Sequence, residues 1–314
     1  MNILFDLMAI QPNQAGFHGG SEYGKVVLER LLNQKGEKTI SGIFDPSRGL
    51  NSYLQRLQNE KEIDFIAVSS SLDISELLKN NKFHRFYSAL PYRHHSVDLN
   101  GVDFLFTIHG LRSIEQPSDI YEYKYISNLK LYFKYLYKII FRERYQEIKR
   151  TQFRKLLSNT TNNSKIVVPS YHTKYSLYSE FPYLSPEQIE VLYSPLKNLQ
   201  SNNESNTIKN TLGKYSLRSK EYILITSAKR WIKNAYRAIK AVDELFEDFP
   251  DINKKVLVLG ADDNTFLKKS IKNRDKFLFT GYVEEKELNI LYQEAFALLY
   301  PTLNEGFGYP PLES

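Results

Sequence analysis

The chain of 314 residues contains no cysteine and only two methionines. The lack of cysteine excludes a disulfide framework and a thiolate metal site. No run of about eighteen apolar residues occurs, so any contact with a membrane would be peripheral. The chain does not open on a charged, apolar and small-residue signal segment, and together with the missing cysteine this predicts a reducing, cytosolic compartment.

The residues that are present favour ordered domains. Hydrophobic residues make up 42% of the chain and aromatic residues 14%, which suffices for two globular domains, each with its own core. The positive charge is concentrated in one segment. Residues 124–155 contain ten lysines and arginines against two glutamates, so their net charge of +8 exceeds the +6 of the whole chain.

Short apolar runs alternate with helical stretches, a pattern typical of parallel sheets covered by helices. In the first half the predicted strands lie at 1–6, 64–68, 104–108 and 166–168, with a helix near 26–32. After a polar stretch at 198–210, further strands are predicted at 222–226, 255–259, 277–280 and 297–300, with helices near 234–247, 264–272 and 285–295. The sequence thus predicts two α/β domains, at 1–197 and 221–314, joined by a linker at 198–220. Ligands of such domains bind at the carboxyl ends of the strands, in a cleft.

The most informative segment is the loop that follows the last predicted strand, where Glu305 and Glu313 flank a turn with two glycines. Pro310 and Pro311 suit the first turn of a helix, and a helix N-terminus in a cleft binds anions. Glu305 would lie near the reacting group, and Glu313 would accept hydrogen bonds from a ribose diol. The alternative is a surface loop with a helix-capping glutamate.

A basic loop, 227–234, opens a helix at the same predicted edge and holds Lys229, Arg230 and Lys233. Cations at a helix start oppose the helix dipole, and a bound phosphate would remove that conflict. The alternative is a solvated basic loop. In the first half, Gly19-Gly20 suits close approach to a phosphate but lacks the G-x-G-x-x-G spacing, and His109 follows a strand at the cleft edge, where a purely structural role is the alternative.

These motifs together resemble the family 4 retaining glycosyltransferases, which have the GT-B fold of two facing, doubly wound Rossmann-like domains. One residue departs from the family pattern, because Gly110 follows His109 where an acidic residue often stands. The matching motifs are Gly19-Gly20-Ser21-Glu22, Thr107-Ile108-His109, Val168-Pro169-Ser170, Lys229 to Asn234, Thr280-Gly281-Tyr282-Val283 and Glu305-x7-Glu313.

The resemblance implies a donor site in which Lys229 or Arg230 acts with Lys233 to bind the diphosphate. It also implies that Glu305 approaches the donor sugar, that His109 contacts the sugar, and that Glu313 holds the ribose. The catalytic residues would then be Glu305 and His109, and the donor-binding residues Gly19, Gly20, Lys229, Arg230, Lys233, Val283, Gly306, Phe307, Gly308, Tyr309 and Glu313. We expect no cofactor and no metal, since Asp262-Asp263 reads as a helix start and no Asp-x-Asp metal signature occurs.

The function implied by the resemblance is transfer of a sugar from a nucleotide-sugar donor to a glycan or lipid-linked glycan acceptor, with retention of configuration, in cell-surface polysaccharide biosynthesis. A GT-B sugar-nucleotide epimerase or phosphorylase is one alternative, and a non-catalytic subunit that needs a partner chain is another. A family member would continue the helix at Glu313. We therefore expect a second domain truncated at Ser314 and a weakened donor site.

The basic segment reads as one amphipathic helix near 124–157 in the first domain, with cations mostly at four-residue steps and aromatic residues between them. Such a helix suits an anionic membrane surface. The alternative is a helix packed on the first domain with a solvated charged face, and nucleic acid is the least favoured partner. If this helix binds a membrane surface, we expect the protein in the cytoplasm, bound peripherally to the inner face of the plasma membrane.

Overall fold

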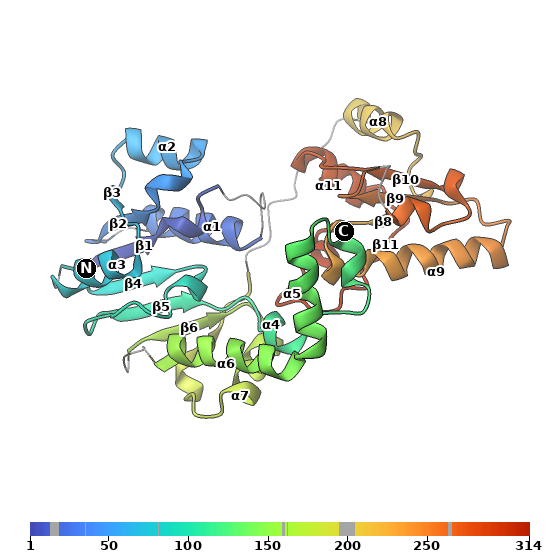
Figure 1. Ribbon diagram of the computed structural model, residues 1–314. Coiled ribbons are helices and arrows are strands. Elements are labelled where there is room, and N and C mark those ends of the chain that lie inside the picture. Colours follow the sequence, from blue (N-terminus) through green and yellow to red (C-terminus); the bar gives the residue numbers. More distant parts are fainter. Residues whose placement is uncertain are drawn as a thin grey trace. The chain divides into compact units, whose positions relative to one another are not determined.

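The computed structural model describes residues 1–12, 19–34, 36–80, 82–158, 161, 163–194, 205–262 and 266–314 (Figure 1). The chain divides into two compact units. Unit 1 comprises Met1–Ile114 and Gln146–Pro195, and unit 2 comprises Glu115–Tyr145 and Leu196–Ser314. Each unit is built on one parallel sheet, as the sequence predicts.

Unit 1 holds a seven-stranded parallel sheet in the order β3-β2-β1-β4-β5-β6-β7. Its strands are β1 (Asn2–Asp6), β2 (Thr39–Phe44), β3 (Asp64–Ala67), β4 (Arg85–Ser88), β5 (Asp103–Thr107), β6 (Lys165–Val168) and β7 (Ile189–Val191). Its helices are α1 (Gly19–Asn33), α2 (Ser52–Asn59), α3 (Ser71–Lys79) and α7 (Tyr171–Glu180). Two further helices, α4 (Arg112–Glu115) and α6 (Arg142–Ser158), contain the positions in the sequence at which the chain passes from one unit to the other.

Unit 2 holds a four-stranded parallel sheet in the order β10-β9-β8-β11. Its strands are β8 (Tyr222–Ile225), β9 (Lys255–Leu259), β10 (Phe277–Thr280) and β11 (Ala297–Leu298). Its helices are α5 (Leu129–Ile140), α8 (Ser205–Lys214), α9 (Ala235–Asp248), α10 (Phe266–Lys269), α11 (Glu285–Gln293) and α12 (Tyr309–Glu313).

Both sheets are buried on both faces. In β1, Leu4 packs into one hydrophobic cluster while Ile3 and Phe5 pack into another. In β9, Val256 and Leu257 likewise belong to different clusters. Successive side chains of a strand point to opposite faces, so this alternation places a core on each side of each sheet, as in doubly wound folds.

The basic segment differs from its prediction. Instead of one helix near 124–157, the structure has a one-turn helix at Glu122–Tyr125, then α5, then α6. The chain leaves the helical conformation at Phe141, where φ is −112° and ψ is 45°. Residues 115–145 group with unit 2, so the predicted domain boundary at 197 does not describe this segment.

Long-range contacts explain why this segment belongs to unit 2. Arg237 on α9 donates to Asp119 at 2.9 Å and lies over the ring of Tyr121 at 4.5 Å. The backbone N–H of Tyr236 donates to the hydroxyl of Tyr125 at 3.2 Å. These partners are more than a hundred residues apart in the chain, so no local pattern could predict them.

The predicted linker at 198–220 is also partly helical. Its first residues, through 204, lie outside the described residues, but α8 covers Ser205–Lys214. Leu212 of α8 is buried against the core of unit 2, and Lys214 pairs with Glu287 of α11 at 2.8 Å. The polar composition predicts a loop here, whereas the buried leucine fixes a helix.

Candidate active site

Two loops of unit 2 meet at the carboxyl edge of its sheet. One follows β8 and contains the one-turn helix Trp231–Lys233, and the other follows β11. The backbone N–H of Leu303 donates to the Ile232 carbonyl at 2.9 Å, and the Thr302 hydroxyl oxygen lies 3.1 Å from the same oxygen. The side-chain amide of Asn234 donates to the Pro301 carbonyl at 3.0 Å. The basic loop and the Glu305 loop are thus joined, as expected for loops after neighbouring parallel strands.

Lys233 and Glu305 form an ion pair at the centre of this contact. The Oε1 atom of Glu305 accepts hydrogen bonds from the Lys233 ammonium, from the Tyr300 hydroxyl at 2.9 Å and from the Thr302 hydroxyl at 3.0 Å. The Lys233 ammonium also donates to the Tyr300 hydroxyl and lies over that ring, 4.8 Å from its centre. Within the described residues Oε2 has no hydrogen-bond partner, so one oxygen is held and the other is available.

The environment keeps Glu305 ionised. Burial opposes its charge, but Lys233 and the hydrogen bonds outweigh burial, so the pKa of Glu305 lies below its ordinary value of 4.5. Burial and the negative charge of Glu305 raise the pKa of the Tyr300 phenol. Tyr300 therefore remains a hydrogen-bond donor at neutral pH, and it was not among the residues that the sequence predicts for this site.

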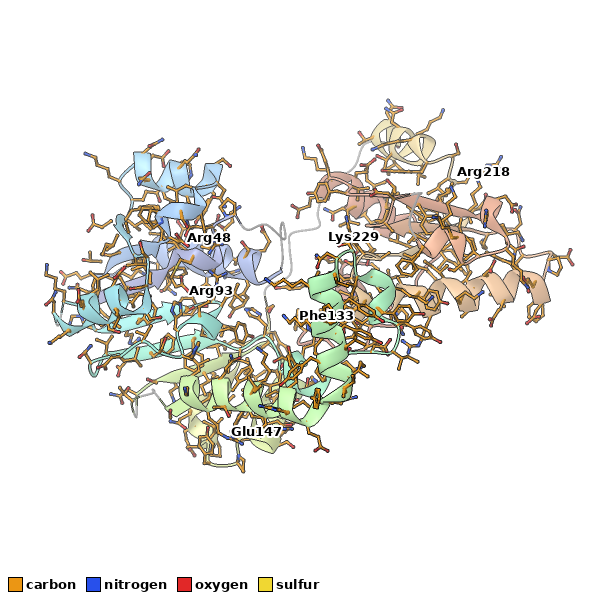
Figure 2. The ribbon with its side chains drawn as sticks, in the orientation of Figure 1. Arg48, Arg93, Phe133, Glu147, Arg218 and Lys229 are labelled. Carbon is orange, nitrogen blue, oxygen red and sulfur yellow. The ribbon has the colours of Figure 1, made fainter. Side chains whose placement is uncertain are left out.

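The other two cations of the basic loop differ from Lys233 in exposure. Lys233 is only 7% exposed, whereas Lys229 and Arg230 are exposed; Lys229 is labelled in Figure 2. Both ends of the loop adopt the left-handed conformation, at Ser227 with φ 56° and at Asn234 with φ 59°. This conformation is uncommon outside glycine and marks a tightly constrained turn. The loop therefore presents two solvent-facing cations beside one buried cation.

The glycine segment leads into α12, as predicted. Gly308 has φ 87°, a conformation that favours glycine, and directly precedes the helix. The rings of Phe307 and Tyr309 pack edge to face, 5.1 Å apart. Glu313 is partly exposed. Burial of the Tyr292 phenol raises its pKa to about 12, and the negative charge of Glu313 adds to this rise. Gly306 belongs to the same partly exposed segment.

Val283 differs from the other predicted donor contacts of unit 2. Its side chain is 9% exposed and belongs to a hydrophobic cluster of the core. A contact with a donor would have to use its backbone.

The side chain of Asp262 lies close to Gly281. Its Oδ1 atom is 2.8 Å from the position that a Cβ on Gly281 would occupy. Asp263 lies outside the described residues, so the predicted helix start there stays a prediction.

The predicted residues of unit 1 lie at the carboxyl edge of its sheet. His109 follows β5, and its Nε2 donates to the Ala89 carbonyl at 3.0 Å, since a carbonyl only accepts. The ring of Tyr23 packs against it edge to face, with centres 5.0 Å apart. Gly19 and Gly20 are the first residues of α1 rather than a loop before it, so the helix begins earlier than the predicted 26–32.

The backbone explains why Gly110 follows His109. Its φ is 148°, a value that residues with a side chain rarely adopt. An acidic residue at this position would strain the turn. The departure from the family pattern is therefore built into the local fold.

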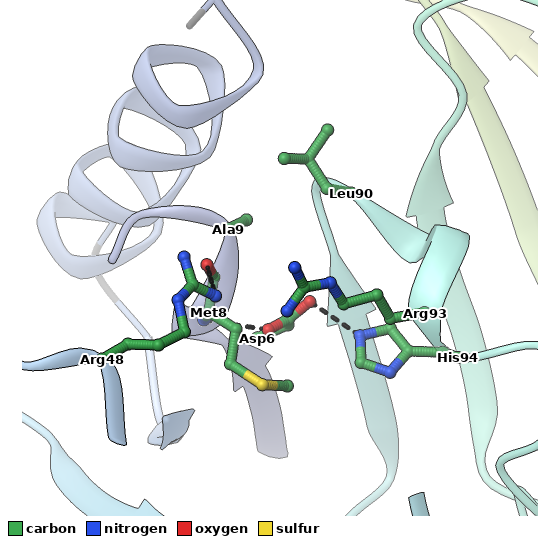
Figure 3. A pocket seen from close by; sticks show the side chains of 7 residues that line it. All are labelled: Asp6, Met8, Ala9, Arg48, Leu90, Arg93 and His94. Atoms are coloured by element: carbon green, nitrogen blue, oxygen red, sulfur yellow. Dashed lines mark hydrogen bonds and ion pairs between the residues drawn. The ribbon is translucent and has the colours of Figure 1, made fainter. Parts of the chain in front are cut away.

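A cavity of about 80 Å³ in unit 1 was not predicted (Figure 3). On one side of the cavity lies Asp6, at the end of β1. Its carboxylate accepts a hydrogen bond from the Ser88 hydroxyl at 2.7 Å and is hydrogen-bonded to Nε2 of His94 at 2.8 Å. Arg48 and Arg93 flank it; burial and then the like charge of Arg93 lower the pKa of the Arg48 guanidinium. These residues come from three separate loops, and only the position of Asp6 at a strand end could have indicated the cavity.

Neither a membrane-spanning helix nor a cluster of metal-ligating side chains occurs in the part of the chain that the structure describes. No helix there is long and apolar enough to cross a membrane. In the same part of the chain, no group of three or more histidine, cysteine, aspartate or glutamate side chains is placed to hold a metal ion.

Comparison with solved structures shows the class of fold. HepE of Anabaena in complex with UDP-glucose superposes with a TM-score of 0.63 at 11% identity, covering 100% of this chain and 77% of that one. WaaG, a glycosyltransferase involved in lipopolysaccharide biosynthesis, gives a TM-score of 0.62 at 14% identity, with 99% and 78% covered. The chain therefore has the GT-B fold of two Rossmann-like parallel-sheet units, which confirms the predicted fold class.

Sequence comparison is more specific for unit 2. Residues 209–314 match the family profile described as glycosyl transferases group 1. The chain is also 28% identical over 172 residues to the O-antigen chain mannosyltransferase RfbU of Salmonella typhimurium strain LT2. That alignment spans 53% of this chain and 44% of the relative, so this chain matches less than half of that protein.

Proposed function

We propose that this protein is a glycosyltransferase that moves a sugar from a nucleotide-sugar donor to a glycan or lipid-linked glycan acceptor in polysaccharide biosynthesis. The match of residues 209–314 to group 1 glycosyl transferases and the mannosyltransferase relative support this proposal. The observation that carries it is the Lys233–Glu305 pair, which joins two loops at the carboxyl edge of the sheet of unit 2. Retention of configuration and family 4 membership belong to the proposal through the resemblance of the motifs.

In the proposed reaction the bond between the sugar carbon C1 and the diphosphate oxygen breaks, and the nucleoside diphosphate leaves with the electron pair. The acceptor hydroxyl oxygen bonds C1 and gives its proton to the oxygen of the leaving diphosphate, which carries it away. Lys229, Arg230 and Lys233 stabilise the charge that develops on the leaving phosphate, so the proposal requires no metal and no cofactor. Glu305 accepts a hydrogen bond from the donor sugar through Oε2, and Glu313 holds the ribose.

The proposal assigns separate roles to unit 1. Gly19 and Gly20 contact the donor phosphates, and His109, whose ring orientation is fixed by Ala89, contacts the sugar. The cavity at Asp6 combines guanidinium donors with a carboxylate acceptor, a set that suits the hydroxyl groups of an acceptor. A location in the cytoplasm, at the inner face of the membrane, completes the proposal.

Turnover of nucleotide sugars tests the proposal. Purified protein would be incubated with uridine, guanosine and adenosine diphosphate sugars, with and without a glycan acceptor, and release of nucleoside diphosphate measured. We expect acceptor-dependent release, reduced about a hundredfold by Glu305→Gln, because this change removes the charge placed at the reacting sugar. The exposed Glu76→Gln, on α3, is the matched control and should keep full activity.

Other outcomes of this experiment would indicate a different function. Product formation without an acceptor would indicate an epimerase, and a requirement for free phosphate would indicate a phosphorylase. No turnover of any donor, or full activity of Glu305→Gln, would contradict the proposal. Proton magnetic resonance of the product anomer would decide between retention and inversion.

A further inference from the structure

Helix α5 exposes a stripe of large apolar side chains to solvent. Leu129, Phe133, Leu136 and Ile140 follow one another at steps of four, three and four residues, so they lie on one side of the helix. Leu129 is 69% exposed, Phe133 61% and Ile140 66%, whereas Leu136 is half-buried. Figure 2 labels Phe133 on this helix. Soluble proteins rarely leave such a contiguous apolar surface uncovered.

The other side of α5 already has a partner. Tyr135 and Lys138 are its buried residues, and the ammonium of Lys138 forms an ion pair with the buried Glu122. The same ammonium lies 5.6 Å from the ring centre of Trp231, in the basic loop of the candidate active site. Helix α5 is therefore fixed to unit 2 by one face, which leaves the opposite apolar face exposed.

The charges around the stripe are mainly positive. Lys130, Lys134, Arg142 and Arg144 are exposed, and the charge of Lys138 is balanced by Glu122. Between 129 and 145 the only carboxylate is Glu143. The exposed surface thus combines apolar and aromatic side chains with a net positive charge, a combination that binds the headgroup region of anionic membranes.

We propose that the exposed face of α5, with its flanking cations, docks unit 2 on an anionic lipid surface. A second copy of the chain is a poorer partner, because a twofold interface would bring the same cations together. Beyond Arg144, helix α6 takes no part: Phe153, Leu156 and Leu157 are buried, and its exposed large apolar residue is Ile148, at 44%. The docking segment is thus narrower than the 124–157 helix predicted from the sequence.

The proposal deepens the proposed function, since a lipid-linked acceptor would lie at such a surface, but lipid binding can be measured without turnover. The full chain would be floated with vesicles of phosphatidylcholine alone and of phosphatidylcholine with phosphatidylglycerol. We expect binding to the anionic vesicles that weakens as salt is added. Phe133→Ser should lower binding roughly tenfold, and Lys130→Glu with Lys134→Glu should lower it by more than about tenfold.

Matched controls separate docking from general effects. Phe249→Ser removes an aromatic ring of similar exposure, 57%, and Lys155→Glu with Lys209→Glu makes the same change of charge on α6 and α8. Both should bind vesicles as the unaltered chain does. All the altered side chains are exposed, so the melting temperatures of the variants should equal that of the unaltered chain. Phe133→Ser should also turn over a water-soluble acceptor at the unaltered rate.

Three results would overturn the proposal. The unaltered chain could fail to bind anionic vesicles, or the controls could lose binding as much as the α5 variants. Light scattering could instead show an oligomer that Phe133→Ser dissociates, which would make this face a contact between protein chains. Loss of vesicle binding with normal turnover would leave the proposed function intact.

Discussion

At the scale of single residues, the candidate site depends on how one carboxylate is held. Three donors converge on Oε1 of Glu305, from Lys233, Tyr300 and Thr302. Charge-assisted hydrogen bonds of this kind are stronger than neutral ones and fix the direction of the side chain. Glu305 is therefore both ionised and oriented before any ligand arrives, and the Tyr300 hydroxyl, which is hydrogen-bonded to both Lys233 and Glu305, supports their direct ion pair.

The lowered pKa of Glu305 makes a prediction about stability and pH. The folded chain binds this proton less tightly than the unfolded chain does, so the ionised carboxylate stabilises the fold above the ordinary value of 4.5. That contribution is lost as the pH falls through the lower, folded pKa. We expect Glu305→Gln to destabilise unit 2 by about 2 kcal/mol at neutral pH, and this difference should shrink toward zero on acidification.

Denaturant unfolding from about pH 6 to about pH 3.5 measures this difference. The chain has a single tryptophan, Trp231, so its fluorescence follows unit 2. Glu76→Gln, on an exposed surface of unit 1, serves as the control and should leave the unfolding of unit 2 unaltered at every pH. A difference between the unaltered chain and Glu305→Gln that stays constant or grows on acidification would show that Glu305 is not held as described.

Single residues of the site differ in how far the sequence could predict them. Glu305 and Lys233 could be predicted, because each follows a predicted strand and parallel strands end at one edge. The role of Tyr300 could not, since a tyrosine at a strand end has no distinctive pattern. The cavity at Asp6 was missed for a different reason: Asp6, Arg48 and the adjacent Arg93 and His94 come from three separate parts of the chain, and only the folded sheet brings them together.

At the scale of elements, α5 is held by a buried ion pair between Lys138 and Glu122. The other carboxylate oxygen of Glu122 accepts from the Ser118 hydroxyl at 2.5 Å. Removing one partner of a buried pair leaves a charge without compensation. We expect Lys138→Met to destabilise unit 2 by about 3 kcal/mol, and Lys138→Met with Glu122→Leu to recover much of that loss.

Denaturant unfolding followed by Trp231 emission gives the four free energies of this double-mutant cycle. Coupling between the two positions should be large, because the single change is worse than the double. If Lys138→Met unfolds at the same denaturant concentration as the unaltered chain, the pair does not attach α5. Purely additive losses would lead to the same conclusion.

Elements were predicted well where they are apolar and poorly where they are short or polar. The strands at 64–68, 104–108, 222–226 and 255–259 match β3, β5, β8 and β9 to within a residue or two at each end. Strands β4 (Arg85–Ser88) and β7 (Ile189–Val191) were missed because they are short, and β2 (Thr39–Phe44) because Ser41-Gly42 interrupts its apolar run. The end of α5 at Phe141 was missed because no glycine or proline marks it.

At the scale of the whole molecule, two parallel-sheet units of the GT-B fold each present loops at the carboxyl edge of their sheet. The sequence predicts this architecture from the alternation of strands and helices. It assigns 115–145 to the wrong unit, because the contacts that decide the assignment join positions more than a hundred residues apart. In unit 2, the basic loop and the Glu305 loop should together bind a nucleoside diphosphate.

Calorimetric titration with nucleoside diphosphates tests this claim most directly, and Trp231, two residues before Lys233, provides a fluorescent signal from the same loop. We expect saturable binding of at least one nucleoside diphosphate, a change in Trp231 emission, and no binding of the bare nucleoside. Lys233→Met should weaken binding roughly tenfold or more, because it removes a charge-assisted contact to the phosphates. Equal binding by Lys233→Met, or no heat and no emission change with any nucleoside diphosphate at millimolar concentration, would contradict the account.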